Sequence, residues 1–210
     1  MRHYRIIAAV CILTSTLAAS ASEPALGLRS EFGALLSSGR NNFTTATGGL
    51  AVTYWLSDAE QDEISLGVSF AKLDYGSPWL SLYGSQDKLN GRQDVLLSGY
   101  RHYFRPRSED LRFFCGLDAG IVQYSGTAKS TRPQNGGSTE TESDFTRWRP
   151  AVGASLGIEY NFTRNCSLQA FYRYLLVSEL GDFSAGAALG SFHVGQDRTH
   201  ALLLGLNYRF

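Results

Sequence analysis

The sequence predicts an all-β protein, specifically an eight-stranded antiparallel up-and-down transmembrane β-barrel. Three observations predict this fold class. Apolar side chains recur with a period of two in eight segments, long and short connections alternate between these segments, and the opposite face of the segments carries glycines and charges of both signs. A period of two indicates a strand with one apolar face. Residues 22–210 supply enough chain for one domain.

The final segment, residues 199–210, shows the pattern most clearly. Its unbroken apolar row, at a spacing of two, consists of Leu202, Leu204, Leu206, Tyr208 and Phe210. A soluble protein seldom ends on a buried apolar side chain, because chain ends fray. The closing strand of a membrane barrel can do so, because closure leaves no free strand edge in lipid.

This ending resembles that of bacterial outer-membrane β-barrels, whose last strand typically finishes in Phe after alternating apolar residues. The resemblance is to the small eight-stranded group that includes the OmpA transmembrane domain, OmpX-type barrels and opacity-type porins. It implies an outer-membrane location, contact with lipid and lipopolysaccharide, and a C-terminal signal for the barrel-assembly machinery at Leu206, Tyr208 and Phe210. The resemblance to OmpA covers the barrel and no periplasmic peptidoglycan-binding domain, so we do not expect cell-wall anchoring.

The N-terminus has the pattern of a secretory signal peptide, residues 1–21, which leaves the barrel domain in residues 22–210. Arg2 and Arg5 precede an apolar run over 6–17 that is too short for a membrane-spanning helix, and small residues occupy the cleavage region. Removing the signal takes away two bases and no acids, so 17 basic residues face 19 acidic ones. This balance argues against a nucleic-acid partner.

Each of the eight segments has its own apolar row. The predicted strands cover residues 25–37, 47–56, 63–75, 93–104, 110–124, 147–160, 167–178 and 199–210. In the fourth strand the register is open, since Val95 and Leu97 compete with Leu96 and Tyr100 for the outward face. Aromatic residues near the strand ends suggest an interface girdle, comprising Tyr54, Trp55, Tyr103, Phe104, Phe113, Tyr160, Tyr208 and Phe210.

The connections alternate between long and short. Long loops are predicted at 38–46, 76–92, 125–146 and 179–197, with short turns at 57–62, 105–109 and 161–166. All four long loops would then lie at one end of the barrel, expected to be extracellular, and both mature termini at the other, expected to be periplasmic. The loop over 125–146 is almost without apolar residues and is expected not to fold alone.

The polar face of the strands separates a membrane barrel from a soluble one such as a lipocalin. On a soluble barrel that face would meet water, where strand glycines are unfavourable. Inside a narrow eight-stranded barrel small residues are needed, and here the glycines are Gly27, Gly33, Gly49, Gly67, Gly116, Gly120, Gly153, Gly157 and Gly205. The apolar rows therefore face lipid in our interpretation.

Charges of both signs on the same face predict a lumen charge network. Its members are Arg29, Glu31, Arg112, Asp118, Glu159, Arg173 and Arg209. These groups could form a salt-bridged plug that rigidifies the barrel. Alternatively, the pairs could break and re-form to open a narrow path for ions or small solutes.

The sequence predicts no catalytic, cofactor-binding or metal-binding residue, and no cofactor. Ser191, His193, Asp197 and His200 have residue types that could form a triad, but they fall in a loop and a strand start. Lipid A deacylases carry a Ser two residues after a strand His, a spacing absent here. Whether Cys115 and Cys166 pair is left open.

We therefore expect a monomeric, non-enzymatic barrel with a structural or surface-interaction role through its extracellular loops. Host or phage surface ligands are the further partners considered for these loops. The alternatives are a narrow porin and, third, a lipid A-modifying enzyme.

Overall fold

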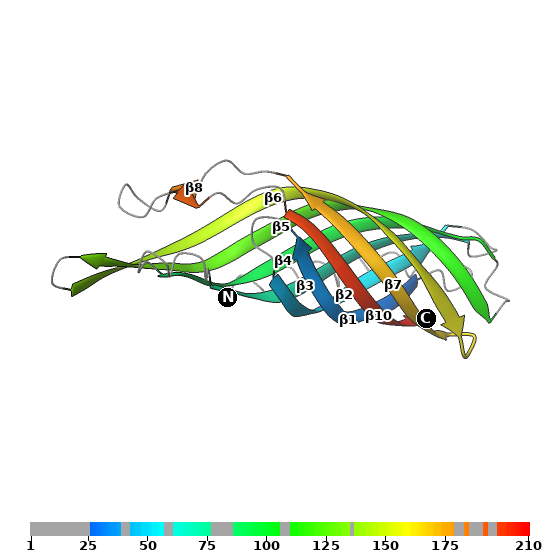
Figure 1. Ribbon diagram of the computed structural model, residues 1–210. Helices are drawn as coiled ribbons and strands as arrows, with labels where there is room; N and C mark the ends of the chain where they lie inside the picture. The colour runs from blue at the N-terminus through cyan, green and yellow to red at the C-terminus, as the bar shows by residue number, and fades with distance from the viewer. Residues whose placement is uncertain are drawn as a thin grey trace.

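The computed structural model describes residues 26–38, 43–56, 61–76, 86–105, 110–134, 137–178, 183–184, 191–192 and 197–210. The predicted signal peptide lies outside the described residues. The strands are β1 (Leu26–Ser38), β2 (Phe43–Trp55), β3 (Asp62–Gly76), β4 (Gln86–Tyr103), β5 (Leu111–Gln134), β6 (Gly137–Asn161), β7 (Cys166–Val177), β8 (Phe183–Ser184), β9 (Ser191–Phe192) and β10 (Asp197–Arg209) (Figure 1). No helix in the described part of the chain is long and apolar enough to span a membrane.

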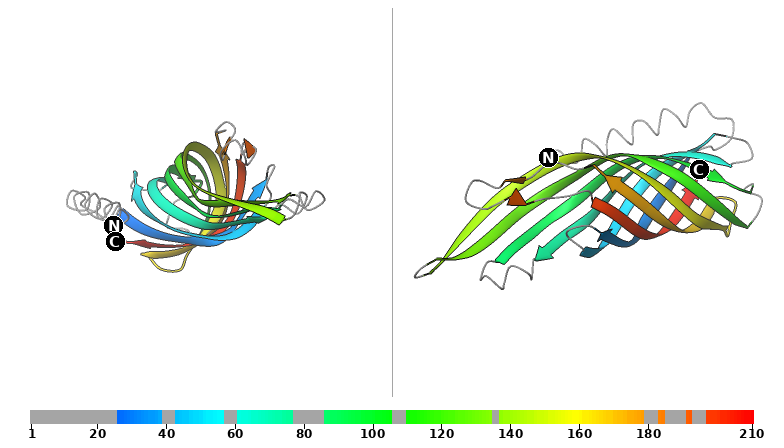
Figure 2. Two further views of the ribbon diagram at one scale, coloured as in Figure 1. Left: turned by 90° about the vertical axis from the view of Figure 1, so that its left-hand side faces the viewer. Right: turned by 45° about the horizontal axis from the view of Figure 1, so that its top comes forward.

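Eight of these strands form a closed antiparallel barrel, which confirms the predicted fold class. Each strand pairs with its neighbours in the order β1-β10-β7-β6-β5-β4-β3-β2, while β8 and β9 form a separate two-stranded sheet. The barrel closes where β1 meets β10, with Gly27 opposite Arg209, and the backbone N–H of Phe210 donates to the carbonyl of Leu26 at 3.0 Å. The strands wrap around a common axis (Figure 2).

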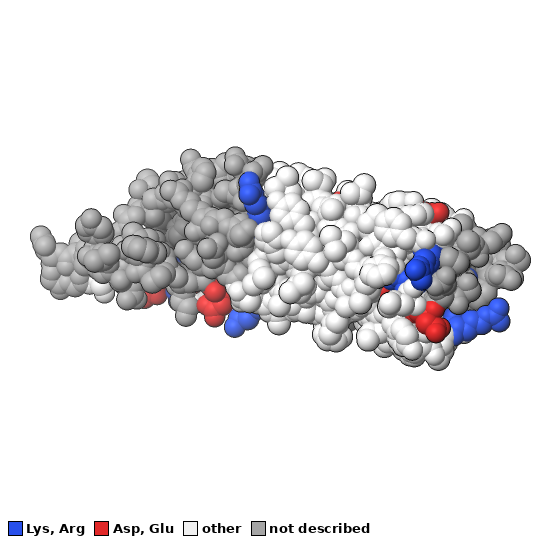
Figure 3. Space-filling view, turned by 45° about the vertical axis from the view of Figure 1, so that its right-hand side comes forward, with Lys and Arg blue, Asp and Glu red and all other residues white. Residues whose placement is uncertain are grey.

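The two faces of each strand have opposite surroundings. On β10 the side chains of Ala201 and Leu203 are buried, whereas those of Leu202 and Leu204 are exposed. On the face of the barrel that Figure 3 shows, the outward side chains form a broad belt without charged residues, and charged side chains lie on both sides of it. Twenty-seven large apolar side chains are exposed among the described residues. Such a belt matches the apolar band of a membrane-spanning barrel.

The prediction that residues 125–146 form a loop is wrong. β5 and β6 continue through this segment as a long hairpin that extends beyond the other strands (Figure 1). β4 lengthens in the same direction, to Gln86, and pairs with β5 as far as Thr131. Cross-strand contacts support the extension: Lys129 lies 2.8 Å from Glu142, and the Thr127 hydroxyl donates to Asp144 at 2.8 Å. Polarity in this segment therefore reflects exposure to water and not a lack of strand structure.

The open register of β4 is settled by burial. Val95 and Leu97 point inward, so Tyr100 points outward and Arg101 and Tyr103 point into the barrel. Trp55 also points inward. The prediction that Trp55 and Tyr103 belong to the interface girdle is therefore wrong, because each stands one residue away from an outward-facing position.

Glycines on the inner face allow large interior side chains to approach the wall. A Cβ atom on Gly116 would lie 2.8 Å from Ser155 Oγ and 2.9 Å from Arg101 Cγ. A Cβ atom on Gly157 would clash with the rings or stems of Phe114 and Phe171. These glycines therefore provide the space that the interior needs.

Candidate functional site in the barrel interior

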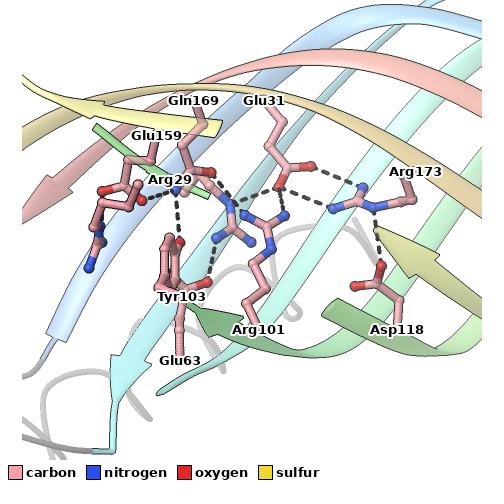
Figure 4. A network of polar contacts seen from close by, with 10 residues as sticks. Arg29, Glu31, Glu63, Arg101, Tyr103, Asp118, Glu159, Gln169 and Arg173 are labelled. Atoms are coloured by element: carbon pink, nitrogen blue, oxygen red, sulfur yellow. Dashed lines mark hydrogen bonds and ion pairs between the residues drawn. The ribbon is translucent and has the colours of Figure 1, made fainter. Parts of the chain in front are cut away.

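The half of the interior near the short turns holds four arginines and four carboxylates. The arginines are Arg29, Arg101, Arg112 and Arg173, and the carboxylates are Glu31, Glu63, Asp118 and Glu159 (Figure 4). They come from β1, β3, β4, β5, β6 and β7, and all are at most 7% exposed. Their formal charges cancel, as expected for charges removed from water.

Glu31 on β1 is the centre of this group. Its carboxylate lies 2.8 Å from Arg29 Nε and 3.0 Å from Arg173 Nη1, and Arg173 Nη2 donates to the same carboxylate at 3.2 Å. Arg101 Nη2 lies 3.7 Å from Glu31 Oε1. Two arginines thus bind Glu31 closely, Arg173 with a two-pronged contact, which is the strong geometry for guanidinium and carboxylate.

A chain of hydrogen bonds continues from Arg29 towards β6. Arg29 Nη1 donates to Glu63 at 2.5 Å, and the Tyr103 hydroxyl donates to the other oxygen of Glu63 at 3.1 Å. The Gln169 amide donates to Tyr103 at 3.2 Å and to Glu159 at 2.9 Å, where Arg112 also donates at 3.0 Å. Connected networks of this kind rigidify the structure that they cross-link.

Aromatic rings pack against two of the arginines. The Arg101 guanidinium carbon lies 4.7 Å from the Phe114 ring centre and 4.6 Å from that of Phe171. The guanidinium of Arg112 lies 4.0 Å from the Tyr103 ring and 5.1 Å from the Trp55 ring. Cations stacked on rings in this way are stabilised electrostatically, more strongly when desolvated.

The half of the interior towards the β5–β6 hairpin is mainly apolar, but it also holds the buried side chains of Gln93 and Arg149, and the Arg149 guanidinium carbon lies 5.1 Å from the Tyr124 ring centre. Its buried cluster consists of Val95, Leu97, Val122, Tyr124, Ala151, Leu175 and Val177, with Phe145 packed against it. The interior is therefore filled along its length by a charged layer and an apolar layer.

Two small cavities lie beside the charged layer, each of about 20 Å³. Both are lined by Glu31, Ser69 and Arg173. A cavity of this size holds about one water molecule. Neither cavity is large enough for a solute.

The structure places six of the seven predicted network residues in this charged layer. Arg209 instead lies at the end of β10, only partly buried, and its carbonyl accepts from the Asn165 side chain at 2.9 Å. Sequence reasoning missed Glu63 and Arg101. Glu63 alternates with Ser65 and Gly67 on the polar face and could have been found, whereas Arg101 depended on the β4 register.

The residues weighed for enzymatic chemistry are not in this interior site. His102 and His200 face outward, and the Tyr172 hydroxyl contacts His200. Ser191 belongs to β9 and Asp197 to β10, while His193 lies outside the described residues. Cys115 and Cys166 are both free thiols. Over the described ranges, no group of three or more His, Cys, Asp or Glu residues is arranged to hold a metal ion.

A closed barrel with an apolar exterior and a filled interior of buried charges and apolar side chains defines a membrane-spanning β-barrel. The family model described as "Outer membrane protein beta-barrel domain" matches residues 6–210. The chain therefore belongs to this family and is a protein of the bacterial outer membrane.

Solved structures show the same fold at low sequence identity. Neisserial surface protein A aligns with a TM-score of 0.60 and 13% identity, covering 89% of this chain and 97% of its own. Outer membrane protein OprG of Pseudomonas aeruginosa aligns with a TM-score of 0.52 and 13% identity, covering 88% and 95%. Ail of Yersinia pestis, solved in complex with the heparin analogue sucrose octasulfate, aligns with a TM-score of 0.50 and 12% identity, covering 88% of this chain and 97% of its own. No curated protein matches this chain.

Proposed function

We propose that this protein is a closed, non-enzymatic outer-membrane scaffold that holds its extended β-hairpin at the cell surface for contact with other molecules. The observation that carries the proposal is the filled interior. Four buried arginines bound to four buried carboxylates occupy one half, and an apolar cluster together with the buried Arg149 occupies the other. A barrel filled in this way is a rigid support and not a channel.

The extended strands are the part available for surface contacts. β5 and β6 pair as far as Gln134 and Gly137, and their outward side chains in this region include Lys129, Glu140 and Glu142. Rigid strands position a binding surface better than a mobile loop does. Lipopolysaccharide, a host surface and a phage are the partners that such a surface would meet.

The proposed orientation of the barrel in the membrane rests on the difference between its two ends. The turn over 162–165, Leu26 and Phe210 lie at the end opposite the hairpin (Figure 1). In outer-membrane barrels the short turns are periplasmic, so both ends of the barrel chain would face the periplasm. Leu206, Tyr208 and Phe210 form an exposed outward row at this end, as expected of a signal for the barrel-assembly machinery.

Conductance in planar bilayers tests the scaffold. The folded protein should show no steady open state, and a control porin in the same bilayer should. A steady conductance of the wild-type protein would contradict the proposal.

Deleting residues 127–144 should remove binding to whole cells or to lipopolysaccharide and leave the barrel folded, because these residues lie beyond the apolar belt.

The second candidate is a narrow porin, and the two cavities favour it. Both are lined by Glu31 and Arg173, so breaking this ion pair would join the two spaces. Ser69 lines both cavities. Under this alternative the larger side chain in Ser69→Leu should block the path between them and abolish conductance. The matched control Ser98→Leu changes an exposed, outward-facing residue of β4 and should leave conductance unchanged.

The third candidate, a lipid A-modifying enzyme, has no specific observation in its favour. Mass spectrometry of lipid A from cells with and without the protein tests it. An unchanged profile would remove this candidate.

A further inference from the structure

Three side chains of reactive types lie in one row across β3, β4 and β5, on the outer surface near the short turns. In the strand register Asp62 stands opposite His102, and His102 stands opposite Cys115. Cys115 is exposed and has a free thiol. This row is separate from the charged layer inside the barrel and lies on the lipid-facing side of the wall.

His102 is held by its neighbours. Its Nδ1 lies 2.9 Å from Asp62 Oδ1, which also accepts from the Tyr100 hydroxyl at 2.5 Å. Because an ionised carboxylate can only accept, Nδ1 carries the proton and Nε2 is the basic nitrogen. The Phe104 ring meets the His102 ring edge-on at 5.5 Å and limits its rotation.

Cys115 lies on the other side of His102. Directly opposed residues of an antiparallel pair have Cβ atoms about 4.5–5.5 Å apart, so rotation about the Cys115 Cα–Cβ bond brings its sulfur within reach of His102 Nε2. Across the three strands the order is therefore carboxylate, imidazole, thiol. In this order the carboxylate orients the imidazole, and the imidazole can accept the proton of the thiol, which makes the sulfur a nucleophile.

We propose that Cys115 is a self-acylation site that accepts an acyl chain from a phospholipid ester. The proposal rests on the membrane placement proposed above. Cys115 lies four residues, roughly 13 Å, along β5 from Leu111 and between the exposed side chains of Phe113 and Leu117. Tyr160 and Phe104 are also exposed at this end. Aromatic side chains mark the depth of the membrane–water interface, where phospholipid esters lie.

The reaction balances without an added reagent. His102 Nε2 accepts the thiol proton, the sulfur attacks the ester carbonyl carbon, and the bond from that carbon to the glycerol oxygen breaks. His102 then returns the proton to the glycerol oxygen. The products are a thioester on Cys115 and a lysophospholipid. Backbone N–H groups of the paired strands are engaged in the ladder and do not form an oxyanion hole, so a slow single transfer is expected in place of turnover.

Intact and peptide mass spectrometry of the protein folded into phosphatidylethanolamine vesicles tests the proposal. We expect an acyl adduct on Cys115 that neutral hydroxylamine removes, with one lysophospholipid released per adduct. His102→Asn and Asp62→Asn should each reduce the adduct at least tenfold, and both lie on the outer surface, where folding tolerates a polar change. Cys166, which stands opposite Tyr208 at the start of β7, is the matched control and should carry no adduct.

Three results would overturn the assignment: no adduct on Cys115, equal adducts on Cys115 and Cys166, or equal acylation of both asparagine variants and wild type. Failure of the protein to insert into the vesicles would overturn the membrane scaffold as well. Insertion without an adduct would overturn only the acylation site.

Discussion

Replacing Glu31 with Gln removes the carboxylate at the centre of the interior network while keeping its size. The four arginines of the charged layer would then face three carboxylates. Arg29 Nε and Arg173 Nη2 both contact Oε1, so an amide oxygen placed there can still accept from them. Arg173 Nη1 loses its acceptor, Oε2, at 3.0 Å.

Breaking a buried ion pair by removing one partner costs about 3–5 kcal/mol. Because Gln retains one acceptor, we expect the lower end for Glu31→Gln, about 3 kcal/mol, which is roughly a hundredfold in the unfolding equilibrium. Urea titration of the protein in lipid vesicles measures this free energy of unfolding. The surface control is Glu142→Gln: Glu142 is exposed and its partner Lys129 is partly exposed, so little change is expected there.

A compensating double variant tests whether Glu31 and Arg173 are coupled. Glu31→Gln combined with Arg173→Met removes one charge of each sign, and packed apolar atoms replace the guanidinium. Because neutral replacement of a buried pair is often tolerated, the double variant should be more stable than Glu31→Gln alone. If Glu31→Gln were as stable as wild type, or the double variant weaker than the single one, the interior charges would not be coupled as described.

Three further predictions follow from the packing, the hairpin and the last strand. Gly157→Val should lower the free energy of unfolding by about 1–3 kcal/mol through overpacking, whereas Gly205→Ala, whose nearest neighbour would be 3.4 Å away, should be much milder in the same titration. The hydrogen bond and charge of Glu142 raise the pKa of Lys129 above its ordinary value of 10.5. The contribution of this pair to the free energy of unfolding is therefore complete below pH 10.5 and is lost as the pH rises through the raised pKa. An NMR titration that shows no lower pKa of Lys129 in Glu142→Gln than in wild type would refute this. Phe210→Asp should reduce the assembled fraction in the outer membrane, measured by fractionation, and unchanged assembly would contradict a role for the terminal Phe.

The fold could be predicted because a strand that faces lipid on one side and a narrow interior on the other must alternate. The apolar row from Leu202 to Phe210 records the lipid, and the glycines on the polar faces of the strands record the narrow interior. The length of β5 and β6 beyond the apolar belt could not be predicted from alternation of apolar and polar residues. The residues 125–146 are polar on both faces, so their pairing is set by β4 and by contacts such as Thr127 with Asp144.

The candidate site was harder to predict than the fold. In β4 both alternating faces contain apolar residues, because Val95 and Leu97 fill the interior beside the apolar cluster. Periodicity alone therefore could not tell that Arg101 and Tyr103 point inward. The aromatic residues Trp55 and Tyr103 resembled interface residues by type and position, but the interior uses them to pack against Arg112.

The barrel fits a membrane only if its outward apolar side chains face hydrocarbon around a filled interior. Single nitroxide labels at positions 202, 204 and 206, in a Cys115→Ala and Cys166→Ala background, test this most directly in lipid vesicles. We predict high accessibility to oxygen dissolved in the bilayer and low accessibility to a water-soluble nickel reagent at all three positions. Labels more accessible to the nickel reagent than to oxygen, in a protein that stays folded in water without detergent, would contradict it.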